Sequence, residues 1–549
     1  MARRIALAGI SVLAAAATGC GSLPGRDLDP VVMTGAQAGS LQGTPAGRVV
    51  AFARHSSSWQ QIPVQVDERA VVDLGPVRNM SNSGVTATVY TDPNTKVGAD
   101  PDPNLDANDE IAFMARDAGD PASLAPDPPG VVAGSGVEVK VTDPTSPSDV
   151  AWVYLFRSDG SLSPGAGKQY VSYTFSLNSG NYLTTYDFAA GPNPETSSVI
   201  TPRYRRRFSD RWVDDGLDIL AGGASGADIL DRHKPQFGPG VCGRTEDTFK
   251  TGGGGFIANK SGPVRAIRSF LGANSGTFTQ RDHILYEGRE DIVTYLRVHP
   301  IPGVMDYFDY SPAAIGMTYR NDQNTGGVTI DGNPDTLAPG APRWQQVTGG
   351  QGTLTSVSTI DSDIPGLASQ LYYDDDSTPS VTQCTGDAFA YGDSGTWFNQ
   401  ALPNTDSRNG AANRLTSTQT LYYGAPGGTA AGAAQLAGRA QAPLQVSVQP
   451  RSSTAAGTVS LDAIAYTSGA QALGAFYGYS CVAGNPDTIR IEKKVGASWV
   501  AVTTAPLTPQ DGCRVYLAAG VQIAAGTAVR AVALAGSTTV GVSPETTVD

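Results

Sequence analysis

The most constraining feature of this sequence is a stretch of alternating residues between positions 281 and 299. From Ile292 to His299 the residues alternate between two sets, and a period of two places successive side chains on opposite faces of a β-strand. Residues 281–286 are also strand-like, and the polar, glycine-containing segment 287–291 separates the two runs. This pattern predicts a β-hairpin with its turn at residues 287–291.

The expected pairing of this hairpin gathers polar side chains on one surface of a sheet. If Leu285 lies opposite Val293, the odd-numbered residues of both strands share a face. The side chains gathered in this way are Arg281, His283, Tyr295, Arg297 and His299. Arginines hold carboxylates or sulfates in bidentate fashion, and histidine and tyrosine transfer protons. The surface is a candidate catalytic or binding face for an acidic sugar polymer, or else the ordinary wet face of an antiparallel sheet.

Turn-forming residues and chain length set the fold class. The 549 residues include 65 glycines and 37 prolines, and no long stretch has helical periodicity. A chain of this length exceeds one ordinary domain. We therefore expect an all-β protein built from several antiparallel β-sandwich domains.

The first twenty residues have the form of an export signal. Arg3 and Arg4 precede an apolar core at residues 5–17, which is too short to span a membrane. The sequence Ala-Thr-Gly-Cys at residues 17–20 resembles the lipobox of bacterial lipoproteins, although the usual leucine at its first position is alanine in this chain. The resemblance implies that Cys20 is lipidated and anchors an exported protein to the bacterial cell envelope. The alternative is an ordinary cleaved signal.

Composition divides the chain into segments. We expect a signal peptide at 1–19, a flexible tether at 20–45, an N-terminal β domain at 46–165, a central large β-sandwich at 166–448 and a C-terminal sandwich at 458–549. In the last segment, two strand-like runs flank a glycine turn within residues 489–502. This region resembles the Ig-like modules of secreted bacterial proteins, and the resemblance implies a spacing or adhesive role.

Cysteine number and net charge restrict the compartment and the partners. Four cysteines remain after Cys20, and the compositional break near residue 450 favours the disulfides Cys242–Cys384 and Cys481–Cys513. No zinc-type CxxC or Cys/His cluster occurs in the sequence. The formal net charge of −13 argues against nucleic acid as a partner.

An acidic segment at residues 100–110, DPDPNLDANDE, offers oxygen ligands at alternating positions. Calcium takes about six to eight such oxygens. The predicted ligands are Asp100, Asp102, Asn104, Asp106 and Glu110. The segment resembles the acidic calcium loops of secreted bacterial proteins, but it lacks the glycine and glutamate positions of an EF-hand. It is either a structural calcium site or a solvated acidic loop.

The densest positive run in this acidic chain lies at residues 203–207. Its arginines either capture an anionic polymer or pair with the nearby carboxylates of Asp210, Asp214 and Asp215. The second interpretation, in which this run forms the edge of a strand or loop, is the one we favour.

Three classes of function fit these features. The first is an envelope protein that binds or processes an acidic polysaccharide, since residues 261–269 and the strands behind them resemble the large sheets of polysaccharide-processing enzymes. That resemblance carries over no catalytic residue. In a lyase, His283 or Tyr295 would transfer the proton, while Arg281 and Arg297 would neutralise the uronate carboxylate. The second class is a non-catalytic adhesin or binding lipoprotein. The third is a secreted serine hydrolase that uses Ser394 in a Gly-Asp-Ser-Gly sequence.

Overall fold

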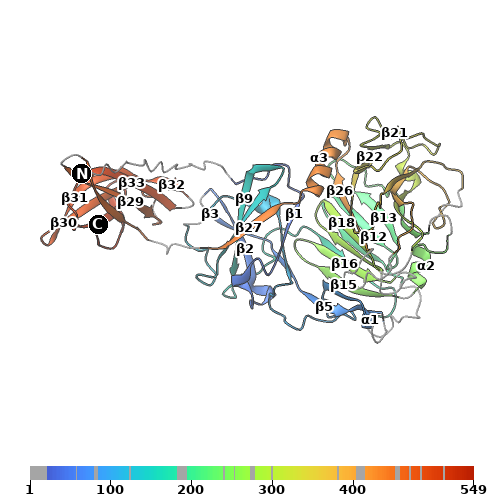
Figure 1. Cartoon of the computed structure of the whole chain (residues 1–549), viewed down its shortest axis with the longest axis horizontal. Coiled ribbons are helices and arrows are strands. Elements are labelled where there is room, and N and C mark those ends of the chain that lie inside the picture. The colour runs from blue at the N-terminus through green and yellow to red at the C-terminus, as the bar shows by residue number, and fades with distance from the viewer. Residues whose placement is uncertain are drawn as a thin grey trace, which may run out of the picture.

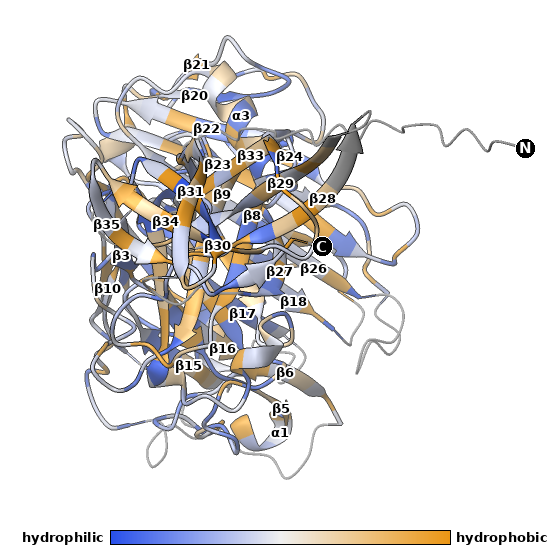
Figure 2. Ribbon diagram, turned by 90° about the vertical axis from the view of Figure 1, so that its left-hand side faces the viewer, coloured by the Kyte–Doolittle hydropathy of each residue, from blue (hydrophilic) through white to orange (hydrophobic). Residues whose placement is uncertain are grey.

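The computed structural model describes residues 21–548 apart from short gaps. The gaps are residues 57, 79–83, 123–124, 182–193, 239–241, 253, 273–278, 298–300, 380–382, 387, 404–413, 452–457, 469–470, 483–484 and 511–512. In the described part, antiparallel pairing joins the strands into eight sheets, which confirms the all-β, multi-sandwich expectation. Figure 1 shows a large body, a smaller sheet domain beside it and a separate lobe at the end of the chain. In β30 (Thr488–Val495), the buried residues Ile489 and Ile491 alternate with the half-buried residues Thr488 and Arg490, as expected where one face is buried. Figure 2 shows hydrophobic and hydrophilic residues interspersed along the strands of the molecule.

The N-terminal domain is a sandwich of two sheets. The three-stranded sheet has the order β1 (Pro30–Thr34), β7 (Glu110–Met114), β4 (Gln65–Asp67). The five-stranded sheet has the order β27 (Gln445–Pro450), β8 (Val137–Asp143), β9 (Ser146–Arg157), β2 (Val49–His55), β3 (Ser58–Ile62). Side chains from both sheets, among them Val31, Ile111, Val139 and Val153, form one core.

Two boundaries expected from composition are wrong. The flexible tether expected at residues 20–45 contains strand β1, which pairs along its whole length with β7 and buries Val31 and Met33. The central domain does not extend to residue 448, because β27 returns to the N-terminal domain and pairs with β8. Both pairings join segments far apart in the sequence, so local composition gives no sign of them.

The central domain is organised on a nine-stranded sheet. Its order is β15 (Gly255–Ser261), β16 (Ala266–Leu271), β17 (Thr279–Leu285), β18 (Arg289–Leu296), β26 (Leu415–Gly424), β23 (Gly352–Ser362), β22 (Trp344–Gly349), β20 (Thr318–Asn321), β21 (Val328–Thr329). The hairpin expected at 281–299 is the pair β17–β18 in this sheet.

Two four-stranded sheets cover the inner face of the nine-stranded sheet. One has the order β10 (Ser172–Thr174), β11 (Ser197–Ile200), β12 (Tyr204–Phe208), β13 (Asp214–Ile219). The other has the order β14 (Leu230–Phe237), β19 (Val304–Tyr310), β25 (Asp393–Phe398), β24 (Gln370–Asp374). Leu285 and Ile292 of the large sheet pack in one core with Leu217 and Phe308 of the smaller sheets. The inner face is therefore closed to solvent.

The outer face of the nine-stranded sheet is covered only in part. A hairpin of β5 (Arg69–Asp73) and β6 (Thr86–Tyr90), with helix α1 (Leu74–Val77), packs through Val89 on Ile257 and Ile267. Helix α3 (Ala430–Gln441) packs on Trp344 and Tyr422 at the other side. The outward side chains of β18, which lies between these two covers in the strand order, are half-buried.

The C-terminal domain is a separate β-sandwich. Its sheets have the orders β28 (Asp462–Ser468), β29 (Gln471–Ser480), β33 (Cys513–Gln522), β32 (Thr508–Gln510), and β31 (Ser498–Pro506), β30, β34 (Ala528–Ala535), β35 (Thr538–Val542), with β36 (Thr546–Thr547) paired to β34. Phe476, Ile489 and Val529 lie in its core. The disulfide Cys481–Cys513 joins neighbouring strand ends within one sheet, because Ser480 pairs with Arg514.

Both predicted disulfides are present. Cys242–Cys384 lies in the central domain and Cys481–Cys513 in the C-terminal one. Disulfides are typical of exported proteins. Among the described residues, no helix has the length and apolar character needed to cross a membrane. Cys20 lies outside the described residues.

Candidate functional site

The register of the β17–β18 hairpin separates the residues expected to converge. Leu285 pairs with Glu290, so Arg281 lies opposite Thr294 and His283 opposite Ile292. Odd-numbered residues of β17 thus share a face with even-numbered residues of β18. The single Arg/His/Tyr surface expected from the sequence is therefore wrong, since Arg281 and His283 face inward while Tyr295 and Arg297 face outward. His299 lies outside the described residues.

On the inner face, His283 belongs to a buried hydrogen-bond network. Its Nδ1 lies 2.8 Å from Glu290 Oε1, and the hydroxyl of Tyr423 donates to Glu290 Oε2 at 2.5 Å. Burial lowers the pKa of His283 to about 3, against the opposing effect of Glu290. His283 is therefore neutral at physiological pH, and it lies beneath the sheet rather than at a solvent-accessible site.

The arginine run at 203–207 supplies the counter-charge for this network. Arg206 contacts Asp214, and its Nε lies 3.5 Å from Glu290 Oε2. Burial raises the pKa of Asp214 to about 8, whereas Arg206 and the hydrogen bonds of His283 and Tyr423 bring the pKa of Glu290 down to about 2 although burial opposes this. At neutral pH, Arg206 and Glu290 therefore carry the charges and Asp214 stays largely protonated.

Arg281 is neutralised in the same layer. Its Nη2 donates to Asp306 Oδ2 at 2.7 Å, and its Nε donates to Thr294 at 2.9 Å. The other oxygen of Asp306 lies 2.7 Å from His233 Nε2, and burial lowers the pKa of His233. The layer thus holds two cations and two anions, all buried. The layer is electrically balanced and leaves no charge for a ligand.

On the outer face, Tyr295 and Arg297 lie together on β18. The guanidinium of Arg297 lies 5.1 Å from the centre of the Tyr295 ring, and its Nη2 donates to Gln280 Oε1 at 2.8 Å. Gln280 in turn donates to Asp282, which also accepts a hydrogen bond of 2.5 Å from Ser269. A hydrogen-bonded chain therefore runs from Arg297 through Gln280 to Asp282.

A second arginine reaches this site from the N-terminal half of the chain. Arg69 begins strand β5, and its Nη1 bonds Glu110 Oε1 at 2.8 Å. The carboxylate of Glu110 also accepts from Tyr90 at 2.8 Å and from Arg265 at 2.7 Å. Arg69 and Glu110 are close enough to act electrostatically on the Tyr295 hydroxyl. The site thus lies where the N-terminal hairpin meets the large sheet.

Arg297 differs from the inner arginines because it lacks an ionic partner. Among the residues that the structure describes, no carboxylate forms an ion pair with Arg297, and its Nη1 has no hydrogen-bond partner. Burial lowers the pKa of Arg297 and raises the pKa of Tyr295 and of Asp282. Tyr295 therefore keeps its proton at neutral pH. Asp282 acts on Arg297 through space and is connected to it only by way of Gln280, so an anion bound to Arg297 would add a direct counter-charge.

Sequence reasoning missed Arg69, Gln280 and Asp282. A two-residue turn would have predicted that Gln280 and Asp282, even-numbered residues of the first strand, share a face with Tyr295 and Arg297. Arg69 had no detectable signal, because it arrives from a hairpin about two hundred residues earlier in the sequence and is placed by tertiary packing.

Ser394 is not placed as a hydrolase nucleophile. It is buried in strand β25, and its hydroxyl lies 3.5 Å from the hydroxyl of Tyr310. A serine nucleophile needs a base within hydrogen-bond reach. No histidine of the described part bonds Ser394, so the structure offers no support for a catalytic triad at this position.

The acidic loop folds largely on its own backbone. Asp100 accepts from the N–H of Asp102 at 2.8 Å, Asp102 accepts from Asn104 at 3.1 Å, and Asp106 accepts from Asn108 at 2.9 Å. Glu110 is engaged by Arg265 and Arg69 instead. In the described ranges, no group of three or more carboxylate, histidine or cysteine side chains is arranged to hold a metal ion. The calcium site stays a prediction.

Comparison with known proteins gives weak matches of structure and none of sequence. No protein-family model matches the chain, and neither does any curated protein sequence. Among solved structures, a glycosyl hydrolase family 38 protein from Enterococcus faecalis is 11% identical with a TM-score of 0.39, covering 89% of this chain and 56% of that one. An alpha-mannosidase from the same organism is 10% identical with a TM-score of 0.39, covering 89% and 54%. A proposed aldose 1-epimerase from Escherichia coli is 11% identical with a TM-score of 0.24, covering 46% and 99%.

This chain spans a little over half the length of the first two proteins. At these TM-scores the similarities support no functional argument, and the proposals below rest on the geometry of the chain itself.

Proposed function

We propose that this protein binds an acidic polysaccharide on the outer face of its nine-stranded sheet, at Tyr295 and Arg297. The observation that carries the proposal is the half-buried Arg297 guanidinium, which donates to the neutral amide of Gln280 and has no ionic partner among the described residues. A cation of this kind is stabilised when the negative charge of a bound ligand acts as its counter-ion.

Each neighbour of Arg297 suits a sugar that carries a carboxylate or sulfate. The guanidinium offers planar, paired donors for such a group. The Tyr295 ring offers an apolar platform for a pyranose, and its protonated hydroxyl can donate a hydrogen bond. Arg69 is paired with Glu110, so Arg297 is the cation that we expect to contact the acidic group of the sugar.

Binding fits these residues better than elimination chemistry does. A lyase needs a base to remove a proton beside the carboxylate, and the raised pKa of Tyr295 keeps that hydroxyl protonated. His283, the other expected base, is on the inner face behind the sheet. The residues on the outer face therefore favour recognition of the polymer, with turnover as a second outcome to be measured in the same experiment.

The proposed setting is the bacterial cell envelope, with a lipid at Cys20 as the anchor. The two disulfides agree with export. The C-terminal sandwich, which we propose to be an Ig-like module, would hold the binding domain away from other surface molecules. Its placement in a domain of its own, after residue 457, supports that role.

The test is a titration of the purified protein with polygalacturonate and, as the neutral control, dextran. We expect binding to polygalacturonate alone, weakened by added salt because the contact is ionic. New unsaturated or reducing ends would add processing to binding. Equal binding to both polymers, or to neither, would contradict the proposal.

A further inference from the structure

A lysine is buried with two carboxyl groups on the outer side of the β14–β19–β25–β24 sheet, away from the proposed binding face. Lys234, Asp309 and Asp393 each have a relative exposure of 0%. They come from three adjacent strands, β14, β19 and β25. Completely buried lysines and aspartates are rare, so this group calls for a specific role.

The strand register brings the three side chains together. Lys234 of β14 lies opposite Tyr307 of β19, and Asp309 lies two residues further along β19 on the same face of the sheet. The Nζ of Lys234 contacts Asp309 Oδ2. Phe308 pairs with Ser394, which places Asp309 beside Asp393 at the end of the ladder. The amine, the first carboxyl and the second carboxyl therefore form a contiguous row across the sheet.

Asp393 is held in a fixed orientation. Its Oδ1 accepts the backbone N–H of Tyr310 at 3.1 Å and that of Tyr391 at 3.3 Å. Its other oxygen is left for the carboxyl of Asp309. Burial raises the pKa of Asp309 to about 7 and the pKa of Asp393 well above its usual range. The charge of Asp309 further disfavours ionisation of Asp393, whereas the hydrogen bond from Asp393 favours the ionised form of Asp309. One proton is thus shared between them at neutral pH.

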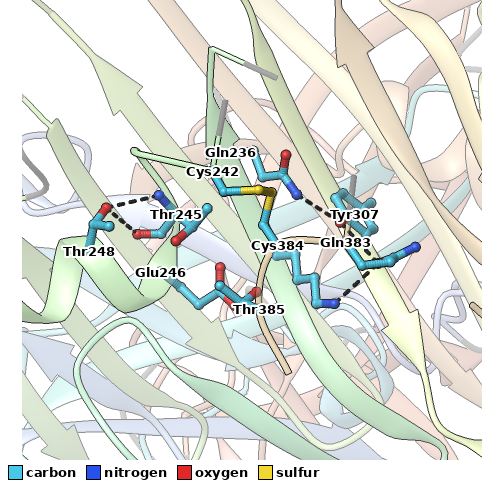
Figure 3. Close-up of a disulfide and its surroundings, with 10 residues drawn as sticks. Gln236, Cys242, Thr245, Glu246, Thr248, Tyr307, Gln383, Cys384 and Thr385 are labelled. Atoms are coloured by element: carbon cyan, nitrogen blue, oxygen red, sulfur yellow. Dashed lines mark hydrogen bonds between the residues drawn. A yellow bond between two sulfur atoms is a disulfide. The ribbon is translucent and has the colours of Figure 1, made fainter. Parts of the chain in front are cut away.

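The surroundings exclude water from this row. Lys234 Nζ donates to Gln383 Oε1 at 3.1 Å, the Tyr307 hydroxyl donates to the same oxygen at 3.3 Å, and Gln236 donates to Tyr307 at 2.9 Å. Figure 3 shows Gln383 and Tyr307 beside the Cys242–Cys384 disulfide, which ties down the segment that carries Gln383. Gln383 itself is fully buried.

We propose that Lys234 and Asp309 are joined by an intramolecular isopeptide bond, formed with Asp393 as the proton-transfer group. The geometry needed is a lysine amine in contact with a carboxyl, and a second, protonated carboxyl next to both. All three side chains are fully buried, so the amide product is protected from hydrolysis.

The reaction is balanced without an added reactant. Lys234 Nζ, after passing one proton to the carboxyl pair, forms a bond to Cγ of Asp309. Asp393 gives its proton to the leaving oxygen and takes a second proton from the nitrogen, so the C–O bond breaks and one water departs. Asp393 ends in the protonation state in which it began. The product links β14 to β19, and, unlike the nearby disulfide, it is not cleaved by reductants.

The test is peptide mapping of the purified full chain by tandem mass spectrometry, after reduction of the disulfides. We expect one species that joins the peptides of Lys234 and Asp309 and is lighter than their sum by one water. The linked species is expected to be absent in Lys234→Met and in Asp309→Ala. Asp393→Ala is expected to fold with the bond unformed or formed many-fold more slowly.

Asp309→Asn provides a matched variant with the opposite outcome. The same amide is expected to form with loss of ammonia, so its linked species has the same mass as that of the parent protein. Separate Lys234 and Asp309 peptides at full stoichiometry in the parent protein would overturn the proposal and leave an ordinary buried ion pair. That measurement needs no variant, so a variant that fails to fold does not affect it.

Discussion

The two faces of the β17–β18 hairpin carry similar residue types with opposite consequences. On the inner face, the cations Arg281 and Arg206 meet Asp306 and Glu290, and the layer is electrically balanced. On the outer face, Arg297 meets the amide of Gln280 and has no ionic partner in the described part of the chain. Both faces belong to the same strand pair, so the face on which a side chain lies decides whether it is part of the buried ion-pair layer or of the proposed binding site.

This difference indicates that the presence or absence of a carboxylate partner distinguishes structural arginines from functional ones. A buried ion pair has little reason to engage a ligand, because breaking it leaves an uncompensated charge. A half-buried cation without a counter-ion carries a desolvation cost that a ligand can offset. The predictions below test this contrast, from the largest expected effect to the smallest.

Removing one inner charge is expected to destabilise the fold strongly. Arg206→Leu leaves Glu290 without its cation, and breaking a buried pair in this way costs about 3–5 kcal/mol. Denaturant unfolding measures the change in free energy. The matched outer-face variant, Arg297→Leu, is expected to cost less than about 1 kcal/mol, as for a charge that lacks a strong partner. Equal costs on the two faces would erase the distinction.

Acid is expected to weaken the inner layer before it affects ordinary carboxylates. The pKa of His283 is about 3 in the folded protein and 6.5 when unperturbed, so below pH 6.5 the unfolded chain binds the additional proton. Stability therefore falls as pH decreases from 6.5, by a few kcal/mol before the folded histidine titrates. In His283→Gln the slope of unfolding free energy between pH 6.5 and 4.5 should be shallower, and an unchanged slope would exclude His283 as its source.

Calcium is expected to act through the acidic loop and not through the inner layer. If the loop binds the ion, saturating calcium stabilises the protein by about 1–3 kcal/mol, as for any ligand that binds only the folded state. Thermal unfolding with calcium and then with EDTA measures this shift, and Asp102→Asn combined with Asp106→Asn should abolish it. A calcium shift that survives in the double variant would place the ion elsewhere.

Loss of the Tyr295 hydroxyl is expected to give the smallest effect. Tyr295→Phe retains the ring beside Arg297 and removes one hydrogen-bond donor, which is worth about 0.5–1.5 kcal/mol. Affinity for polygalacturonate should fall a few-fold, with the stability of the protein unchanged. A gain in affinity would show that the ring alone faces the polymer.

Local signals in the sequence predicted much of this fold, whereas long-range pairing and register were out of reach. Alternation located the strands of the hairpin, and the compositional break gave both disulfide pairs. The favoured pairing of the 203–207 run with nearby aspartates is confirmed for Arg206 and Asp214. Composition could not show that β1 and β27 belong to the N-terminal domain, because their partners are distant in the sequence.

The error in register came from the length of one turn. The N–H of Tyr286 donates to the carbonyl of Arg289 at 2.8 Å, so the hairpin turns on Glu287 and Gly288 alone. A Cβ at Gly288 would come within 2.5 Å of Arg203 Cδ and 2.9 Å of Leu28 Cδ2, so these side chains would have to shift for any other residue. Assigning five residues to the turn changes the register by an odd number of residues and moves one strand's side chains to the other face.

The most direct test of the central claim is the dissociation constant of polygalacturonate for Arg297→Gln, measured at low salt beside Arg343→Gln. Arg343 is 67% exposed in its side chain and pairs with Asp322, so it controls for a simple loss of positive charge. We expect Arg297→Gln to bind about ten- to a hundredfold more weakly, as for loss of a charged hydrogen-bonding partner, and Arg343→Gln to bind as the parent protein does. Unchanged affinity in Arg297→Gln would contradict the assignment of the outer face as the binding site.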